Sequence, residues 1–441
     1  MTAPPNRDIR ARIWSGWALL FIAALAIRLV AVFVLDAPSE AAARGAWKTG
    51  YEATSFAQSI AAGDGFANPW RRDEAPWSEP SGPSAWLPPA YPALLASLLR
   101  ACGGFGVESM WALFVVQSLV SAATACVLVA LGSALSARRA GVLAGWLYAL
   151  YPAAIWNVRT VWDTTLSAFA FTLFLWALFA HGRGARAPRA ALLGAGFGLA
   201  LWVNPAPLAL APVIACVLVA RAAGESRGAA LLRLATFGGA ALAVVLPWLV
   251  RNERTLGALS LRTNLGVELA IGNFDGAVGY HQPRLHPSFD PAEFARYREL
   301  GEVRYAAARM DEFRAWLATH PARFTELCAR RVLLFWYGVA PPHDPRHEDG
   351  LRAALDPKSW VKWLQHATVG LLSLVGAGIL ARRGFEGRCV AAILVLFPLV
   401  YYATHVLERY RFAIEPLLVL LASVVLLALA DRGRARRKAA A

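Results

Sequence analysis

The sequence lacks the short motifs that mark several common classes of protein. It contains no Gly-rich loop of the P-loop type, no Gly-x-Ser-x-Gly turn and no quartet of cysteines at metal-ligand spacing. It also has no internal repeat of solenoid length and no low-complexity region. The absence of a nucleotide-binding loop disfavours an ATP-driven pump.

Acidic residues are also scarce, with 29 Asp and Glu against 44 Lys and Arg. The excess lies in six short segments, at residues 1–12, 138–139, 183–189, 221–233, 382–388 and 431–441. These segments hold 19 Lys and Arg against 4 Asp and Glu, which accounts for the whole net charge of +15. Basic charge spread over short loops is the positive-inside pattern of membrane proteins. It disfavours nucleic acid as a partner, because a nucleic-acid-binding protein needs one continuous basic surface.

Long apolar runs separate these basic segments, and 57% of the residues are hydrophobic. We therefore expect an all-α polytopic membrane protein with about ten transmembrane helices and both termini in the cytoplasm. The predicted spans cover residues 13–35, 110–135, 141–156, 164–180, 190–203, a stretch ending at 220, 232–250, 360–380, 389–403 and 412–430.

The spans and loops divide the chain into four parts. Residues 1–250 form a transmembrane core with seven spans and an external loop at 36–105, which should contain juxtamembrane helices. Residues 251–323 form a second external, soluble segment, in which 291–318 has helical periodicity and Asp290 is the expected N-cap. Residues 324–358 are expected to be interfacial or re-entrant, because a span here would place the basic segment 382–388 outside. Residues 359–441 supply three C-terminal spans and a basic cytoplasmic tail.

The loop after the first span contains an unusual combination of features. It carries Glu52 at the start of a short amphipathic helix, with Tyr51, Phe56 and Ile60 on one face. A Gly-rich turn follows, and then an aromatic and proline-rich platform at 86–92. A carboxylate beside an apolar shelf at a membrane surface suits chemistry on a lipid-linked substrate.

Three stretches of the chain resemble one family. The first loop reads G-Y-E-x-x-x-x-A-x-S-I-A-x-G-x-G-F from Gly50 and G-P-S-A-W-x-P-P-x-Y-P from Gly82. Residues 272–287 contain G-N-F-D-G-A-V-G-Y-H and then H-P, and residues 408–416 read E-R-Y-R-F-A-I-E-P. In their order along the chain and in the side of the membrane on which they are expected, the stretches resemble bacterial family 39 glycosyltransferases. These are relatives of dolichyl-phosphate-mannose–protein mannosyltransferases in the membrane-embedded C superfamily.

The resemblance implies a hexosyl- or pentosyltransferase of the bacterial cytoplasmic membrane. Its donor would be a polyprenyl-phosphate sugar, and its acceptor a glycan, lipid or protein on the external face. The long external loops favour such an enzyme, but a transporter or flippase of lipid-linked sugars also needs intramembrane arginine and an apolar groove. A structural subunit of an envelope complex is a third possibility, in which Glu52 would be dispensable.

Two acids are the candidate catalytic residues. Relatives often carry Asp or Asp-Glu in the first loop, where Glu52 is the nearest acid here. We expect a partly dehydrated interface to raise the pKa of Glu52 and make it a better base, although a first-turn acid can also simply stabilise a helix dipole. Asp163 follows Arg159 in a short external turn. It could pair with Arg159, line the acceptor path, or serve only as the N-cap of the next span.

Basic and aromatic residues are the candidates for binding the donor phosphate and the acceptor. Arg409 and Arg411 resemble the basic-aromatic signature of the family and would hold the leaving phosphate, unless they are snorkelling interface residues. Arg28 lies inside the first span, either snorkelling or paired with Glu52 or a lipid phosphate. The other predicted substrate-binding residues are Lys48, Tyr51, Arg159, Asn273, His281 and Tyr410.

The resemblance implies no certain cofactor, although some relatives use a divalent metal ion. His281 with His286, or His343 with His347, has a spacing that permits metal binding. Pro345 argues against a regular helix between the second pair. Asn273 and His281 are better interpreted as acceptor-side or loop-structuring residues, so no metal ligand is assigned from the sequence.

Overall fold

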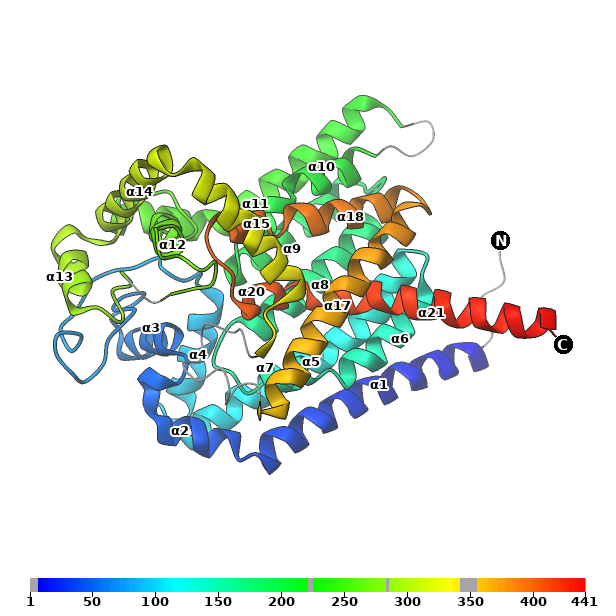
Figure 1. The fold of residues 1–441 in the computed structure, drawn as a ribbon, viewed down its shortest axis with the longest axis horizontal. Coiled ribbons are helices and arrows are strands. Elements are labelled where there is room, and N and C mark those ends of the chain that lie inside the picture. The colour runs from blue at the N-terminus through cyan, green and yellow to red at the C-terminus, as the bar shows by residue number, and fades with distance from the viewer. Residues whose placement is uncertain (1–6, 221–224, 283–284, 342–354, 441) are drawn as a thin grey trace.

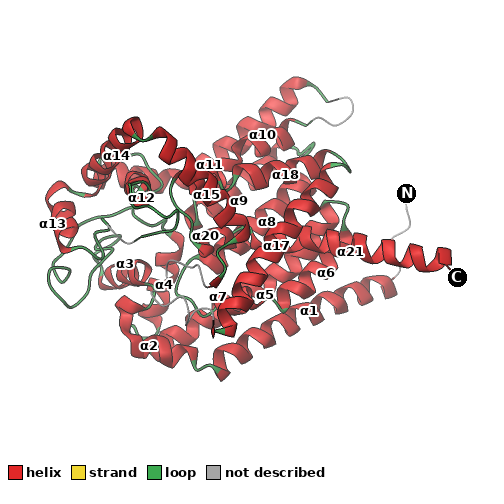
Figure 2. Cartoon of the chain, viewed as in Figure 1, coloured by secondary structure: helices red, strands yellow, loops and turns green. Residues whose placement is uncertain are grey.

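The computed structural model describes residues 7–220, 225–282, 285–341 and 355–440. Helices dominate this part of the chain, and its only β-type pairings are two isolated bridges (Figure 2). Seven helical stretches are long and apolar enough to cross a membrane, at Gly16–Val34, Val107–Ala134, Thr164–His181, Arg227–Leu256, Pro357–Ala381, Phe385–Ala403 and Glu415–Ala439. The prediction of an all-α polytopic membrane protein is confirmed.

The predicted spans correspond to helices of unequal length. Seven of them lie in α1 (Arg7–Val34), α5 (Val107–Ala134), α8 (Thr164–His181), α11 (Arg227–Leu256), α17 (Pro357–Ala381), α18 with α19 (Phe385–Leu396 and Leu399–Ala403) and α21 (Glu415–Ala440). Two more are shorter apolar helices, α9 (Ala187–Val203) and η1 with α10 (Ala206–Leu210 and Ala211–Val219). The span predicted at 141–156 is broken into α6 (Arg138–Ala149) and α7 (Pro152–Asn157), since Pro152 cannot continue a helix.

Close helix contacts depend on small residues in the bundle. A Cβ atom on Gly194 of α9 would lie 2.1 Å from the Phe237 carbonyl oxygen of α11. A Cβ atom on Gly376 of α17 would lie 2.1 Å from the Leu421 carbonyl oxygen of α21. Both helix pairs therefore pack backbone against backbone, which is how membrane helices gain contact without a hydrophobic driving force.

The two predicted external segments form a single helical cap at one end of the bundle (Figure 1). The cap contains α2 (Ala37–Lys48), α3 (Tyr51–Ala62), α4 (Ala90–Ala101), α12 (Leu265–Gly272), α13 (Pro291–Leu300) and α14 (Glu302–Thr319). One buried cluster joins Phe56, Trp70 and Trp86 of the first segment to Phe294 and Tyr297 of the second. The two segments therefore share one core.

Details of the second segment differ from the sequence prediction. Asp290 does cap α13, accepting hydrogen bonds from the backbone N–H groups of Ala292 and Glu293. The helix predicted over 291–318 is two helices, because Gly301 adopts φ 76° and breaks it. The expected boundary at residue 324 falls inside α15 (Pro321–Tyr337).

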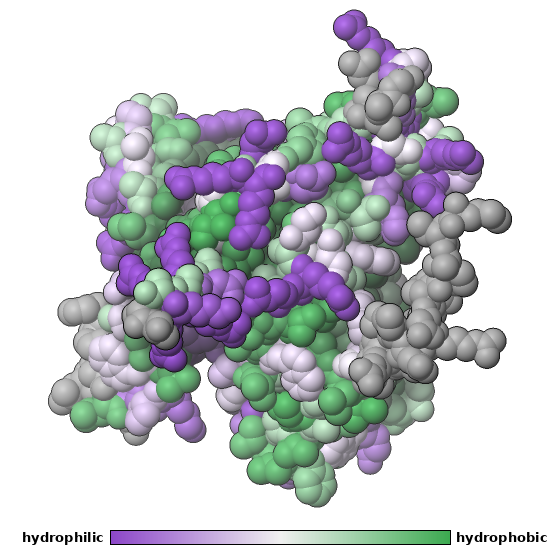
Figure 3. Space-filling model, turned by 90° about the vertical axis from the view of Figure 1, so that its right-hand side faces the viewer, coloured by the Kyte–Doolittle hydropathy of each residue, from purple (hydrophilic) through white to green (hydrophobic). Residues whose placement is uncertain are grey.

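The two chain termini leave the bundle at the end opposite the cap (Figure 1). Figure 3 faces that end and shows many hydrophilic side chains across it. The molecule thus has two chemically different ends, one basic and one formed by the cap.

Candidate functional site

A cavity of about 390 Å³ lies where the cap meets the bundle. This volume is within the range of about 300–1,000 Å³ that is typical of small-molecule sites. Its walls come from the start of α3, the turn before α8, the end of α9, the start of α12 and α20 (Glu408–Phe412). The charged and imidazole side chains that line it are Glu52, Asp163, Arg262, Glu268, His281, His286 and Arg409.

The backbone at Gly50 fixes where α3 begins. Gly50 is the N-cap residue of α3 with φ 74°, a conformation that favours glycine. A Cβ atom here would lie 2.3 Å from the carbonyl oxygen of Val161, so the start of α3 presses directly on the turn before α8. This contact brings Glu52 and Asp163 to the same cavity.

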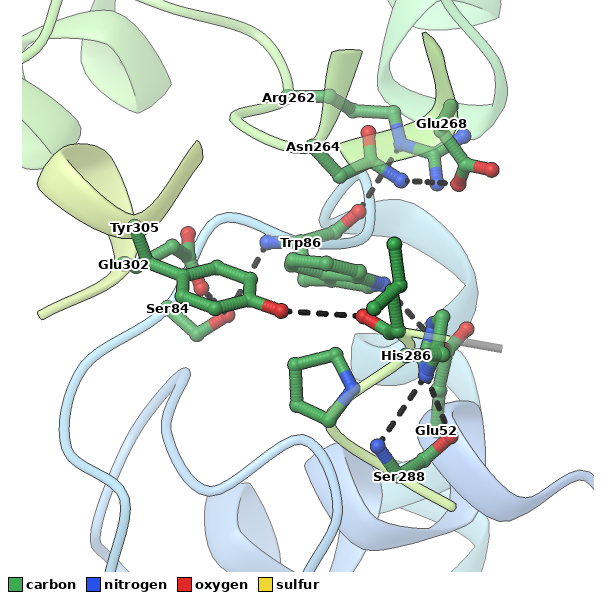
Figure 4. A network of polar contacts seen from close by, with 12 residues as sticks. Glu52, Ser84, Trp86, Arg262, Asn264, Glu268, His286, Ser288, Glu302 and Tyr305 are labelled. Carbon is green, nitrogen blue, oxygen red and sulfur yellow. Dashed lines mark hydrogen bonds and ion pairs between the residues drawn. The ribbon is translucent and has the colours of Figure 1, made fainter. Parts of the chain in front are cut away.

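Glu52 is 3% exposed and is oriented by two side chains of the cap (Figure 4). The indole Nε1–H of Trp86 donates to its Oε1 at 2.9 Å, and His286 Nε2 lies 3.4 Å from the same oxygen. The backbone N–H of Ser288 donates to His286 Nδ1, so the proton that faces Glu52 is on Nε2. Within the described part of the chain, Glu52 Oε2 has no hydrogen-bond partner.

The predicted rise in the pKa of Glu52 is wrong. Burial alone would raise the pKa. The hydrogen bond from His286 and the positive charges of Arg409 and Arg262 outweigh burial and lower the pKa below its ordinary value. Glu52 is therefore held as an ionised carboxylate.

Asp163 has different partners from those expected. Its Oδ2 accepts hydrogen bonds from Ser167 Oγ at 2.7 Å and from Asn204 Nδ2 at 3.4 Å. The predicted pair with Arg159 does not form, because Arg159 turns away toward Glu40 at 3.9 Å. Nor does the Asp163 side chain cap α8. Burial raises the pKa of Asp163, whereas the pKa of Glu52 is lowered, so the environment shifts the pKa values of these two acids in opposite directions.

The two arginines of the E-R-Y-R motif have separate environments. The Arg409 guanidinium lines the cavity, lies 4.1 Å from the ring centroid of Trp162, and has a buried Nε without a hydrogen-bond partner. Arg411 instead forms a buried ion pair with Glu415, in which its Nε and Nη2 each contact a carboxylate oxygen at 2.9 Å. The prediction that both would hold a phosphate in one site is not met by Arg411, which does not line the cavity.

Besides Arg159 and Arg411, three other predicted binding residues lie away from the cavity lining. Arg28 is fully buried, and its guanidinium donates to Ser121 Oγ and to the carbonyl oxygens of Ala24, Tyr148 and Ala149, so it pairs with neither Glu52 nor solvent. Lys48 is an exposed residue at the end of α2. Asn273 is buried and donates to the carbonyl oxygens of Leu269 and Ala403.

The structure thus brings together six of the predicted site residues, which are Tyr51, Glu52, Asp163, His281, Arg409 and Tyr410. It adds Arg262, Glu268 and Asn264, which the sequence analysis missed. Glu268 is a lone acid in the apolar run L-G-V-E-L-A-I-G, and such an acid is a signal that could have been used. Arg262 and Asn264 carry no comparable signal.

The fit of a metal ion can be judged from the donor atoms. No three His, Cys, Asp or Glu side chains within the described ranges are placed to hold a metal ion together. His281 and His405 have ring centroids 4.8 Å apart, and the Nδ1 atom of each is buried without a hydrogen-bond partner. The second predicted pair, His343 and His347, lies outside the described residues.

A multi-pass helical bundle with a cavity under a helical cap is the class of protein that these features define. No family model matches the sequence, and no curated protein matches it. A crystal structure of the apo oligosaccharyltransferase from Archaeoglobus fulgidus is similar, with a TM-score of 0.54 and 12% sequence identity over 96% of this chain and 52% of that one.

A structure of the archaeal oligosaccharyltransferase AglB from the same organism, in complex with an inhibitory peptide and a dolichol-phosphate, matches with a TM-score of 0.46 and 12% identity. That match covers 94% of this chain and 51% of the other. The chain therefore spans about half the length of the solved structures that it resembles. It shares the fold of the apo oligosaccharyltransferase over most of its own length.

Proposed function

We propose that this protein is a membrane glycosyltransferase that moves a sugar from a polyprenyl-phosphate donor to a hydroxyl-bearing acceptor. One observation carries the proposal. Glu52 is a buried carboxylate whose Oε2 has no hydrogen-bond partner among the described residues, Arg409 has a buried Nε that is likewise unpartnered there, and both line the same cavity. A base for the acceptor and a cation for the leaving phosphate are the two groups that this reaction needs.

Glu52 is the proposed base and Arg409 the proposed phosphate ligand. The acceptor hydroxyl gives its proton to Glu52 Oε2 as its oxygen bonds to the anomeric carbon. The bond from that carbon to the phosphate oxygen breaks, and the phosphate leaves with the electron pair. A single displacement of this kind inverts the anomeric carbon. Arg262 lines the cavity beside Glu268 and adds a second positive charge for the phosphate.

The other predicted residues have supporting roles in this proposal. Asp163, whose pKa is raised by burial, would orient the acceptor by hydrogen bonding. Tyr51, Tyr410 and His281 would shape the walls around the sugar. The apolar part of the lining, including Pro88, would receive the first isoprenoid units of the donor.

The proposed setting is the external face of a bacterial cytoplasmic membrane. The positive-inside distribution supports placing the basic end, with both termini, in the cytoplasm and the cap outside. The shared oligosaccharyltransferase fold supports glycosyl transfer, and the first-loop motif supports a lipid-linked donor and a family 39 type of enzyme. The acceptor would be a glycan, lipid or protein.

The decisive experiment follows release of free polyprenyl phosphate by purified protein in nanodiscs. A panel of labelled polyprenyl-phosphate sugars serves as donors, with a membrane extract as the acceptor source and parallel reactions in EDTA to test for a divalent ion. We compare wild type with Glu52→Gln and with Asp64→Asn, a turn acid of the same loop whose side chain is half exposed. Release that is lost only in Glu52→Gln supports the proposal. Release by all three proteins would mean that a residue other than Glu52 is the base. Translocation of intact donor in liposomes without release favours a flippase.

A further inference from the structure

Glu302 is a buried carboxylate outside the cavity lining, and each of its two oxygens accepts two hydrogen bonds. It lies in the first turn of α14 and is 4% exposed. Its Oε1 accepts from the backbone N–H of Ala85 at 2.7 Å and from Thr263 Oγ1, and its Oε2 accepts from Ser84 Oγ and from the Tyr297 hydroxyl at 2.7 Å. Four donors on one carboxylate are more than the packing of α14 requires.

These four donors come from three different parts of the cap. Ser84 and Ala85 directly precede the platform of the first external segment, Thr263 belongs to the second segment, and Tyr297 to α13. The negative charge also lies at the N-terminus of α14, where the helix dipole favours it. Glu302 therefore ties the platform to the second segment through one ionised group.

Trp86, the first residue of the platform, contacts the proposed base Glu52. Trp86 is 1% exposed, its backbone N–H donates to Ser84 Oγ at 3.1 Å, and its carbonyl oxygen accepts from Arg262 Nε at 2.9 Å. Its indole Nε1–H donates to Glu52. Figure 4 shows Ser84 and Trp86 between Glu302 and Glu52.

Little else could compensate if the platform moved. The Trp86 ring packs edge to face on Trp70 and His286, with centroids 4.9 and 5.4 Å away. His286 is the second group that orients Glu52. A shift of Trp86 would therefore weaken its own hydrogen bond to Glu52 Oε1, while Ser288 still holds His286 through the Nδ1 atom.

We propose that Glu302 is a positioning residue that acts through Ser84 and Trp86 to orient the Glu52 carboxylate. It touches neither the cavity nor any reacting atom, so its effect is transmitted by the backbone of residues 84–86. The inference rests on the proposed function only for its kinetic readout, because the orientation of Glu52 can also be observed directly.

The test is the pH at which Glu52 takes up a proton. The charged and titratable groups that face Glu52 are Tyr51, Arg262, Glu268, His281, His286 and Arg409. Each of them stays in place in the variants below, so a change in the titration reports the hydrogen bond from Trp86.

We would measure donor turnover against pH for wild type, Glu302→Gln, Trp86→Phe and the double variant. Trp86→Phe removes the indole N–H and should move the acidic limb of kcat/KM up by roughly one pH unit, since a hydrogen bond to the charged form favours that form. Glu302→Gln should move it in the same direction by less. The double variant should equal Trp86→Phe alone, since both changes act on one contact. Glu299→Gln, an exposed acid of α13, should leave the limb unchanged.

A second readout does not depend on turnover. The carboxyl stretch of Glu52 in infrared difference spectra, identified by its loss in Glu52→Gln, should titrate at higher pH in Glu302→Gln and in Trp86→Phe. If no donor is turned over but this shift appears, the proposed function fails and the positioning role stands. If Glu302→Gln does not fold, Ser84→Ala removes one of its four donors and should give a smaller shift in the same direction.

Two outcomes would overturn the inference. In the first, kcat/KM of Glu302→Gln falls by the same factor at every pH, while the acidic limb and the titration of the Glu52 carboxyl stay at their wild-type pH. That result would indicate a purely structural role for Glu302. The other is a double variant whose shift is the sum of the two single shifts.

Discussion

Arg409 and Arg411 lie two residues apart in one motif, yet truncating Arg409 should lower activity and truncating Arg411 should lower stability. Arg409→Ala removes a guanidinium that faces the cavity and rests on Trp162. A hydrogen bond to a charged group is worth about 1.5–3 kcal/mol, which corresponds to a loss of roughly ten- to 150-fold in kcat/KM. Because the phosphate gains negative charge as it leaves, most of this loss should fall on kcat.

Arg411→Ala should instead destabilise the folded protein. Its partner Glu415 is 4% exposed, and the remaining contact of that carboxylate is the hydroxyl of Tyr151. Removing one member of a buried ion pair costs about 3–5 kcal/mol, because the other charge stays buried without its partner. Replacing both members, with Arg411→Met and Glu415→Leu, should recover much of that loss.

The assay measures thermal unfolding in detergent and turnover per folded molecule for each variant. We expect Arg409→Ala to unfold close to wild type and turn over slowly. We expect Arg411→Ala to unfold at a lower temperature, with the surviving folded fraction turning over normally. The reasoning is refuted if Arg409→Ala keeps wild-type turnover per folded molecule, or if Arg411→Ala unfolds like wild type.

Three further variants test other contacts. His286→Ala removes a hydrogen bond that lowers the pKa of Glu52, so the acidic limb of kcat/KM should move to higher pH, with activity regained as pH rises. Gly50→Ala should lower both stability and kcat, because its Cβ would meet a carbonyl oxygen at 2.3 Å and φ 74° adds about 1 kcal/mol of strain. Arg28→Met should leave the buried carbonyl oxygen of Ala149 without its side-chain donor at a cost of about 1–3 kcal/mol, lowering the unfolding temperature with turnover per folded molecule unchanged.

Each of these has a contrary result that is easy to recognise. An acidic limb in His286→Ala at the wild-type pH contradicts its role at Glu52. Gly63→Ala is the control for Gly50→Ala, since it has φ 99° but nothing within 4 Å of its Cβ, and equal losses in both would implicate strain alone. A fall in turnover per folded Arg28→Met molecule would indicate a part for Arg28 in the site.

The sequence allowed much of the fold and the centre of the site to be predicted. Apolar runs and basic loops are local signals, so the bundle and its cap could be expected from them. The motif residues Glu52, His281 and Arg409 lie far apart in the chain, yet line one cavity. The resemblance grouped these residues before the structure placed them around one cavity.

Side-chain partners could not be predicted in the same way. Arg409 and Arg411 share a short helix, and successive helical residues are about 100° apart, so these two side chains must point to different sides. Which carbonyl groups Arg28 would satisfy depends on where α6 breaks. The pKa of Glu52 depends on His286 and Arg262, which come from the second external segment. These facts belong to tertiary packing, and no local pattern contains them.

The cavity has one wall from the start of α3 and another from α20, which lies just before the last helix of the bundle. A ribosome makes these walls at very different times. Until the region around Arg409 has been synthesised and inserted, the cavity lacks one of its walls and the proposed phosphate ligand. On the proposed function, the protein would become competent only when its final helices have joined the bundle.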